Sequence, residues 1–389
     1  MPASKKTPPL RVNSAEVARR AGVSRTTVSF VLNDVRDRGI SEATRERVLA
    51  IVREIGYAPN AAARSLAGGA TRTVALVVPQ VDHLHVDAFL AQLVASVNEA
   101  CHDNGLRLLI ESTEGQGREP GGFLELVRSR SIDGLIVANL RTDEIGHLRR
   151  LRDGGVPLVV FGSHFPASEG FCTMGDDTWR SAQLAVRHLL ALGHRCIGLV
   201  NYASPEFHSA RQREHGWRQA LLDQGITPEP RWIACGDISA HSGYEATREL
   251  LARGIAFTAL LAGNDTIAFG MLKALREAGL RVPEDVAVVG YDDIPLAPFA
   301  APPLTTVRTD PIAHGRLAVL RLLAQLHPGG PPIAFAEVEP TLVVRASCGA
   351  AGAAPAPLAT RAPLATAAAS KPPRPRGRKA RVPGADGSP

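Results

Sequence analysis

The sequence contains no run of about 18 apolar residues, the length that a membrane-spanning helix needs. Its first residues, MPASKKTPPL, include lysines but no hydrophobic stretch after them, so we expect no signal peptide and a cytoplasmic protein. With 45% hydrophobic and 21% charged residues, a chain of 389 residues is long enough for two or three packed domains of ordinary polarity.

Cysteine is scarce, and the sequence places no two cysteines as a C-x-x-C pair and no histidine at zinc-ligand spacing from them. We therefore expect buried reduced thiols rather than a disulfide framework or a metal site. The five are Cys101, Cys172, Cys196, Cys235 and Cys348.

Catalytic motifs are also missing. The sequence contains no G-x-G-x-x-G, G-x-x-x-x-G-K-[ST], G-x-S-x-G or H-E-x-x-H, so no phosphate-cradling loop, nucleophile elbow or zinc helix is evident. We expect that the protein is not an enzyme and needs no cofactor.

The net charge of +6 is unevenly distributed. Residues 1–72 hold 13 Lys and Arg against 6 Asp and Glu, and residues 350–389 hold 7 against 1, whereas residues 73–349 hold 24 against 31. Basic ends and an acidic middle suit terminal segments that meet nucleic acid.

Three short helices are predicted before residue 57, each with a capping residue at its start. Asn13, Ser24 and Ser41 are the caps; the first helix ends at Gly22 and the third at Gly56. Their apolar residues recur at helical spacing and can form one small core, made of Val17, Ala18, Ala21, Val28, Val31, Leu32, Val48, Val52 and Ile55.

The segment EVARRAGVSRTTVSFVLN has the length, glycine position and apolar spacing of a helix-turn-helix, whose second helix enters the major groove of DNA. Arg25 can donate to guanine or phosphate, Thr26 can contact a base, and Phe30 offers apolar contact. A solvated amphipathic hairpin would fit the same pattern. The predicted base-facing residues are Arg25, Thr26, Ser29, Phe30 and Asn33.

From residue 73, apolar strands alternate with amphipathic helices, which implies parallel sheets with right-handed crossovers. The seven predicted strands exceed one compact sheet, so we expect two α/β lobes with a ligand groove between them. The expected domains are a small all-α headpiece (1–57), a hinge helix and linker (58–72), the two-lobed domain (73–349) and a disordered Ala/Pro-rich tail (350–389). The strands are TVALVVP, RLLIEST, GLIVANL, PLVVFG, CIGLV, ALLAG and VAVVGYDD.

Several ordered segments together resemble the lactose repressor family of bacterial transcriptional regulators. They begin with the helix-turn-helix, SEATRERVLAIVREIGYAPNAAARSLAGG and TRTVALVVP, and continue with HLLALGHRCIGLV, ARQREHGWRQAL, LLAGNDTIAFGMLKAL, DVAVVGYDD and PPLTTVR. The resemblance covers about residues 11–348 and implies a periplasmic-binding-protein-like sensor. Phe30 departs from the family, which usually has a base-reading arginine there, and the loop before Ile40 is slightly long.

The resemblance also implies a hinge helix at 60–67 that folds on operator DNA. Asn60 and Leu66 would contact the DNA, with Leu66 wedged into the minor groove, where it unstacks a base step. Packing of Leu66 against the sensor is the alternative.

Three effector-binding residues follow from the same resemblance. Arg213 would donate to ligand hydroxyls, Asp292 would accept from them, and Asn264 would lie beside the cleft. A structural ion pair between Arg213 and Asp292 is the alternative, and we expect Asp265 to be a helix cap.

Other positions in the expected cleft do not identify the ligand. Gly162-Ser163 lacks the charged pocket residue of many relatives, and Ile238 lacks the aromatic platform of some sugar binders. His83 and His85 could line the cleft or lie exposed on its loop.

The sequence therefore predicts a DNA-binding transcriptional regulator, a repressor in the main interpretation, that binds operator DNA as a homodimer under control of a small effector, most readily a sugar. A ligand-responsive activator, a purine-type co-repressed regulator and a sugar-binding transport protein are the alternatives. In the tail, Arg376-Gly377-Arg378 resembles the core of an AT-hook, and a solvated basic tail is the alternative.

Overall fold

The computed structural model describes residues 13–32, 35–57, 70–113, 121–162, 165, 169–175, 177–329 and 339–350. None of the helices in these ranges is both long and apolar enough to cross a membrane. Asn33, the hinge positions Asn60 and Leu66, and the basic tail lie outside the described residues.

The headpiece has three helices, α1 (Ser14–Ala21), α2 (Arg25–Leu32) and α3 (Glu42–Ile55). The expected caps are confirmed. Asn13 Oδ1 accepts from the Glu16 amide, Ser24 Oγ from the Thr27 amide and Ser41 Oγ from the Thr44 amide. Gly22 ends α1 in the left-handed conformation that glycine adopts without strain. The predicted apolar faces meet in one small core.

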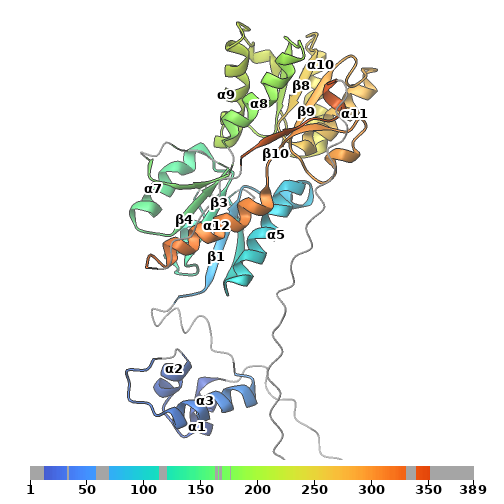
Figure 1. Cartoon of the computed structure of the whole chain (residues 1–389). Coiled ribbons are helices and arrows are strands. Elements are labelled where there is room, and N and C mark those ends of the chain that lie inside the picture. The colour runs from blue at the N-terminus through green and yellow to red at the C-terminus, as the bar shows by residue number, and fades with distance from the viewer. Residues whose placement is uncertain are drawn as a thin grey trace, which may run out of the picture. The chain divides into compact units, whose positions relative to one another are not determined.

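Two parallel sheets follow, each in its own lobe (Figure 1). The N-terminal lobe has the strand order β2-β1-β3-β4-β5, and the C-terminal lobe has the order β11-β10-β9-β8-β6-β7. All pairs are parallel except β10 with β11. The strands are β1 (Thr73–Val78), β2 (Arg107–Ser112), β3 (Gly134–Ala138), β4 (Leu158–Phe161), β5 (Cys172–Met174), β6 (Ile197–Asn201), β7 (Ile233–Cys235), β8 (Ala259–Ala262), β9 (Ala287–Asp292), β10 (Thr305–Arg308) and β11 (Thr341–Val343).

Helices cover both faces of each sheet. In β1, Val74 and Leu76 join one hydrophobic core, whereas Ala75 and Val77 join the core on the opposite face, because successive strand residues point to opposite sides. The helices are α5 (Ala88–Asp103), α6 (Leu124–Arg128), α7 (Ile145–Asp153), α8 (Thr178–Ala191), α9 (His208–Leu222), α10 (Ala240–Ala252), α11 (Asp265–Glu277) and α12 (Pro311–Leu326), with short 3₁₀ turns η1 (Val81–His85), η2 (Thr142–Glu144), η4 (Pro230–Trp232), η5 (Ala297–Phe299) and η6 (Ala346–Cys348).

The chain passes between the lobes three times. It leaves the N-terminal lobe after β5, returns after β10, and crosses again before β11. Helix α12 therefore belongs to the N-terminal lobe although β10 precedes it, and it lies against α5 (Figure 1). Gln325 of α12 exchanges two hydrogen bonds with the backbone of Leu158 in β4.

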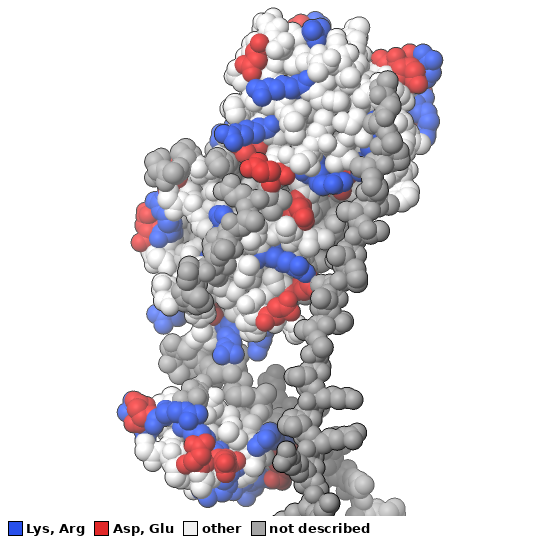
Figure 2. Space-filling model, viewed as in Figure 1, with Lys and Arg blue, Asp and Glu red and all other residues white. Residues whose placement is uncertain are grey.

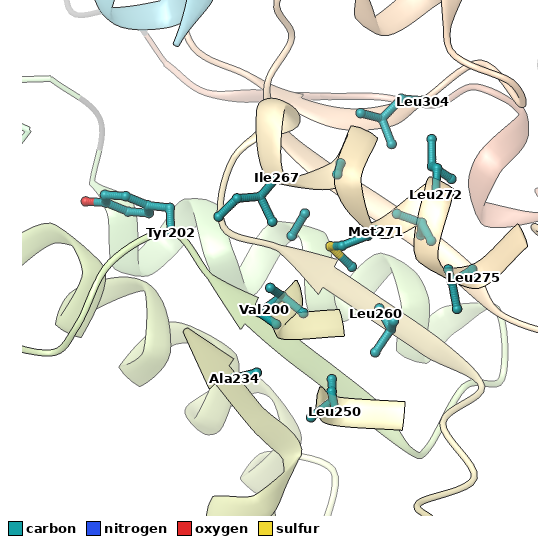
Figure 3. Packing of buried hydrophobic residues seen from close by; sticks show 14 of the residues in the cluster. Val200, Tyr202, Ala234, Leu250, Leu260, Ile267, Met271, Leu272, Leu275 and Leu304 are labelled. Atoms are coloured by element: carbon teal, nitrogen blue, oxygen red, sulfur yellow. The ribbon is translucent and has the colours of Figure 1, made fainter. Parts of the chain in front are cut away.

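The largest core lies between the C-terminal sheet and helices α10 and α11 (Figure 3). Leu260, Ile267 and Met271 are fully buried in it. Tyr202 stands at the edge of this cluster, with its hydroxyl pointing away from the aliphatic side chains (Figure 3). Its ring therefore belongs to the core and its hydroxyl to the space between the lobes.

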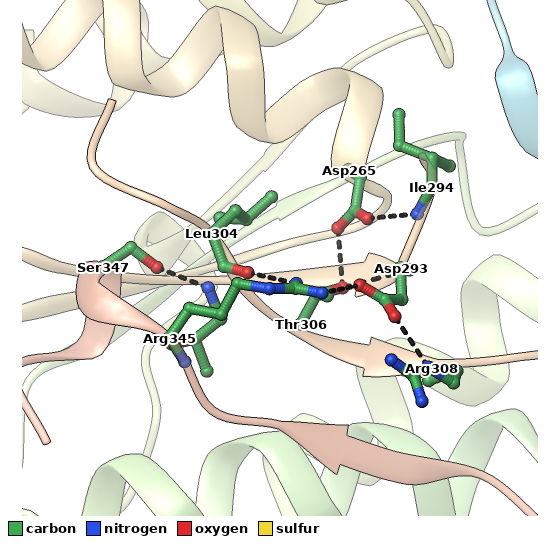
Figure 4. A network of polar contacts seen from close by, with 9 residues as sticks. Asp265, Asp293, Ile294, Leu304, Thr306, Arg308, Arg345 and Ser347 are labelled. Atoms are coloured by element: carbon green, nitrogen blue, oxygen red, sulfur yellow. Dashed lines mark hydrogen bonds and ion pairs between the residues drawn. The ribbon is translucent and has the colours of Figure 1, made fainter. Parts of the chain in front are cut away.

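A buried polar network crosses the C-terminal lobe below the end of β9 (Figure 4). The carboxylate of Asp293 accepts from Arg345 Nη2 at 2.6 Å and from Arg308 Nε at 2.7 Å. Asp265 accepts from the Ile294 amide at 2.9 Å and from the Thr306 hydroxyl at 2.7 Å. Thus the two acids fasten the turn after β9 to β10 and to the chain after β11.

Two predictions were wrong. Asn264, not Asp265, caps α11, because its side chain accepts from the Ile267 amide while Asp265 is the first helical residue and points into the network. The prediction that the thiols are buried was also wrong in part. The five thiols are free, and Cys101 and Cys348 are buried, but Cys235 is exposed at the end of the edge strand β7.

Candidate functional site

A cavity of about 110 Å³ lies between the two lobes. Several of its residues stand at the carboxyl ends of strands, which is where parallel α/β sheets place ligands, because the loops there converge. Its lining includes Pro79, His83, Asp87, Phe89, Asn139, Phe161, Gly162, Tyr202, Ser209, Arg213, Ile238, Asn264, Tyr291, Asp292 and Thr309.

Arg213 projects into this cavity from α9 and is buried. Its guanidinium carbon lies 3.6 Å from the centre of the Tyr291 ring and 4.8 Å from that of Tyr202, and it donates to the carbonyl of Gly263. Aromatic faces attract a desolvated cation, so the two rings hold the guanidinium in place. Its Nε has no hydrogen-bond acceptor among the described residues. Burial and the two rings therefore fix the guanidinium of Arg213 at the cavity wall.

Asp292 ends β9 and is buried beside the same cavity. Its φ of 111° is strained for any residue with a Cβ, and Asp293 follows with a φ of 54°. The Asp293 carboxylate is fixed by two arginines, so the turn that aims Asp292 into the cavity is fastened from below. Strain retained in this way is typical of functional sites.

Asn264 lines the cavity, but its amide is engaged on both sides. Oδ1 accepts from the Ile267 amide at 2.7 Å, and Nδ2 donates to the carbonyl of Ile238 at 3.2 Å. Ile238 has a φ of 56°, so Asn264 holds a strained loop at the cavity wall. For its predicted effector contact, Asn264 retains one N–H and the second lone pair of Oδ1.

The N-terminal lobe contributes residues that the sequence argument missed. Asp87 caps α5, its carboxylate accepting from the Phe89 amide at 3.1 Å. Burial raises the pKa of Asp87 to about 6, against the lowering effect of two backbone N–H donors and of the Arg213 charge. Phe89 and Phe161 lie beside it with ring centres 6.2 Å apart. The sequence signal for Asp87 is a capping acid directly before an amphipathic helix.

Two sets of contacts join the lobes at the cavity. Asn139, after β3, accepts from the Tyr202 hydroxyl at 3.0 Å and from the Ser209 hydroxyl at 2.6 Å. His83 Nε2 lies 3.1 Å from Asp237 Oδ1, and its Nδ1 has no partner among the described residues. Of the two histidines considered, His83 lines the cavity and His85 is exposed.

In the headpiece, the exposed face of α2 is as the helical spacing predicted. Arg25, Thr26 and Ser29 are exposed and Phe30 is half-buried, while Val28 and Val31 are buried in the core. Arg25 Nε donates to the Ser14 hydroxyl at 3.3 Å. Figure 2 shows Lys and Arg side chains at several places on the visible headpiece surface, around a smaller acidic group.

The order of these parts, a helix-turn-helix before a two-lobed sensor, defines a class of ligand-controlled DNA-binding regulators. Residues 15–60 match the family model "Bacterial regulatory proteins, lacI family", and residues 186–348 match "Periplasmic binding protein-like domain".

Relatives extend the match over most of the chain. The HTH-type transcriptional repressor PurR of Photobacterium profundum is 33% identical over 334 residues, which cover 85% of this chain and 97% of the relative. PurR of Haemophilus influenzae (strain PittEE) is 32% identical over 337 residues, which cover 85% of this chain and 97% of the relative.

Solved structures agree. The lac repressor dimer bound to operator and the anti-inducer ONPF gives a TM-score of 0.72 at 30% identity, covering 87% of this chain and 99% of that one. The transcriptional regulator CelR in its cellobiose complex gives 0.62 at 32% identity, covering 87% and 100%. The chain belongs to the lactose repressor family, whose repressors bind operator DNA and small-molecule effectors, and it is a DNA-binding transcriptional repressor of that family.

Proposed function

We propose that this repressor binds its operator as a homodimer, with α2 in the major groove, and that an effector held between the lobes sets its operator affinity. The gathering of Arg213, Asp292 and Asp87 around one cavity between the lobes carries the effector proposal. The exposed polar face of α2 supports the DNA contact. A single short headpiece offers few base contacts, which supports two copies on a two-fold site.

The cavity favours a small polar ring as effector. The cavity volume of about 110 Å³ favours an effector of one ring over a larger one. Sugar hydroxyls both donate and accept, and would meet a guanidinium and two carboxyl groups together. We therefore propose a monosaccharide-sized sugar.

A purine is the second candidate. Phe89 and Phe161 offer aromatic faces for a planar base, and relatives carry the name PurR. The sign of control differs between the two proposals: an inducing sugar would lower operator affinity, whereas a co-repressing purine would raise it.

A thermal-shift screen of the full chain separates these candidates, because a ligand of the native state raises its unfolding temperature. The panel holds monosaccharides, disaccharides, sugar phosphates and purine bases. A hit is then added to a binding assay on DNA selected from a random duplex pool. Monosaccharide hits that lower DNA affinity support the main proposal, purine hits that raise it support the second, and no selected DNA at all contradicts both.

The hinge proposal is tested separately. Leu66→Ala should weaken binding to the selected DNA by about 1–3 kcal/mol and leave effector binding intact, because it removes an intercalating side chain and not the cavity. Equal DNA affinity of the two proteins at matched salt would contradict the hinge assignment.

A further inference from the structure

Arg38, in the loop between α2 and α3, stands over the ring of Phe30 on α2. Its guanidinium carbon lies 5.5 Å from the ring centre. The Arg38 side chain is 59% exposed, whereas Phe30 is half-buried. Among the described residues, Arg38 otherwise meets only the Asp37 carboxylate, at 3.8 Å. A cation held on an aromatic face and open to solvent is available for a further partner.

The start of this loop is fastened to the end of α2. The Val35 amide donates to the Phe30 carbonyl at 2.9 Å, and the Val35 carbonyl accepts from Arg45 Nη2 at 2.8 Å. Arg45 belongs to α3 and is 5% exposed, so it ties the loop to the headpiece core. Gly39 then turns the chain with a φ of 67°, a conformation that favours glycine. The position of Arg38 beside α2 thus follows from the anchored backbone before it and the turn at Gly39 after it.

This position extends the exposed face of α2. Residues four apart share a helix face, so Phe30 lies one turn after Thr26, on the side opposite the buried Val28 and Val31. Arg38 adds a guanidinium at the carboxyl end of that face. If α2 lies in the major groove, the fork of Arg38 lies at the groove as well.

We propose that Arg38 reads a guanine in the operator and that Phe30 is its positioning residue. A guanidinium held over an aromatic ring keeps N–H donors for a further partner, and its planar fork matches guanine O6 and N7 as a bidentate pair. Asp37 is 76% exposed and only loosely paired, so it can give up Arg38 to the base. The inference rests on the proposed seating of α2 in the major groove.

The test is selection of binding sites from a random duplex pool by the full-length protein and its variants. Wild type should enrich guanine at one position in each half-site. Arg38→Ala should lose that preference by roughly 5- to 150-fold and keep the preferences at other positions. Arg38→Lys should restore affinity more than selectivity, because lysine keeps the charge but lacks the fork.

Phe30 variants separate positioning from direct contact. Phe30→Leu should weaken the same guanine preference, and Phe30→Tyr should retain it, since tyrosine keeps the aromatic face. Arg53→Ala is the matched control, because it removes one exposed arginine of α3 from the same headpiece and should shift no base preference.

Other outcomes overturn the inference. Unchanged preferences with Arg38→Ala would remove Arg38 from recognition. An equal loss of affinity for all DNA sequences would make Arg38 a phosphate contact. In that case the slope of log affinity against log salt concentration would also be smaller by about 1. Thr26→Ala and Ser29→Ala distinguish failure of the Arg38 inference from failure of the proposed placement of α2 in the major groove. If they alter base preference while Arg38→Ala does not, only the Arg38 inference fails. If none of the three variants alters base preference, the placement of α2 fails too.

Discussion

The two walls of the cavity are built on different principles. The wall of the C-terminal lobe presents Arg213 and Asp292, both held by buried neighbours, whereas the wall of the N-terminal lobe is mainly apolar and carries one buried acid, Asp87. On the proposed function, the first wall would recognise polar groups of the effector, and the second would cover the effector and exclude water. Ligand recognition and lobe closure can therefore be altered separately.

The contrast extends to what lies behind each wall. Behind Asp292, Asp293 and Asp265 anchor the turn through hydrogen bonds with Arg345, Arg308 and Thr306 (Figure 4). Behind Phe161 lie the aliphatic side chains of the core beneath α5 and α12. A polar network has one satisfied geometry, while apolar packing tolerates small shifts more readily.

The largest expected effect is on the anchored wall. Asp293→Ala should lower the free energy of unfolding by about 3–5 kcal/mol, because it leaves Arg345 buried without its carboxylate. Urea unfolding of the full chain measures it. Glu99→Ala, which breaks an exposed pair with Arg316, is the control and should change stability little. Comparable losses in the two variants would mean that the network does not anchor the lobe.

The next effect concerns recognition by the same wall. Arg213→Ala should weaken effector binding at least about 30-fold, or about 2 kcal/mol, and leave DNA affinity near the wild-type value. Calorimetry with the best ligand of the thermal-shift screen gives the first quantity. Arg213→Lys keeps the charge without the fork and should recover only part of the affinity. Loss of DNA binding with intact effector binding would reverse the assignment.

The opposite wall should respond to pH through Asp87. Because its native pKa of about 6 lies above the ordinary 3.8, the native state holds a proton that the unfolded state lacks between these values. Stability from this group is therefore complete below about pH 4 and lost as the pH rises through 6. Asp87→Asn should keep the helix cap, stabilise the ligand-free protein by up to about 3 kcal/mol at pH 7.5, and weaken a ligand that donates to Asp87.

Thermal unfolding between pH 4 and pH 8 measures this difference. Burial also raises the pKa of Asp265, to about 7, so Asp265 adds the same pH dependence of stability to wild type and to Asp87→Asn. The effect of Asp87 is therefore the difference between the two stability curves. Parallel curves for wild type and Asp87→Asn would show that Asp87 does not titrate in this window.

The smallest effect belongs to the contact between the walls. Asp237→Asn should weaken effector binding by about 0.2–1 kcal/mol, because the Asp237 carboxylate is 71% exposed and its attraction to His83 is screened. Combining it with His83→Gln in a double-mutant cycle isolates the pair. Additive effects would mean that the two residues do not act together in closing the cavity.

The sequence was most informative where structure is decided locally. Asn13, Ser41 and Gly56 each mark a helix end through a hydrogen bond or a backbone conformation within a few residues. All seven predicted strands are present, and Arg213 and Asp292 do line one cavity.

The features missed depend on distant parts of the chain. β5, β7 and β11 have three residues each, too few for a periodic signal, and are defined by their neighbours in the sheet. Asn264 and Asp265 are equally suited to capping by type; what separates them is Thr306, which β10 brings to Asp265. Asp87 joined the site only when the fold placed it within reach of the Arg213 charge.

The three passages of the chain between the lobes have a mechanical consequence. A single linker would let two bodies swivel in any direction, whereas three separate tethers favour rotation about one shared axis. On the proposed function, an effector that closes the cavity would therefore produce much the same displacement at the far end of the N-terminal lobe each time. Such a linkage would convert contact with a small molecule into a reproducible displacement at Thr73, where β1 begins.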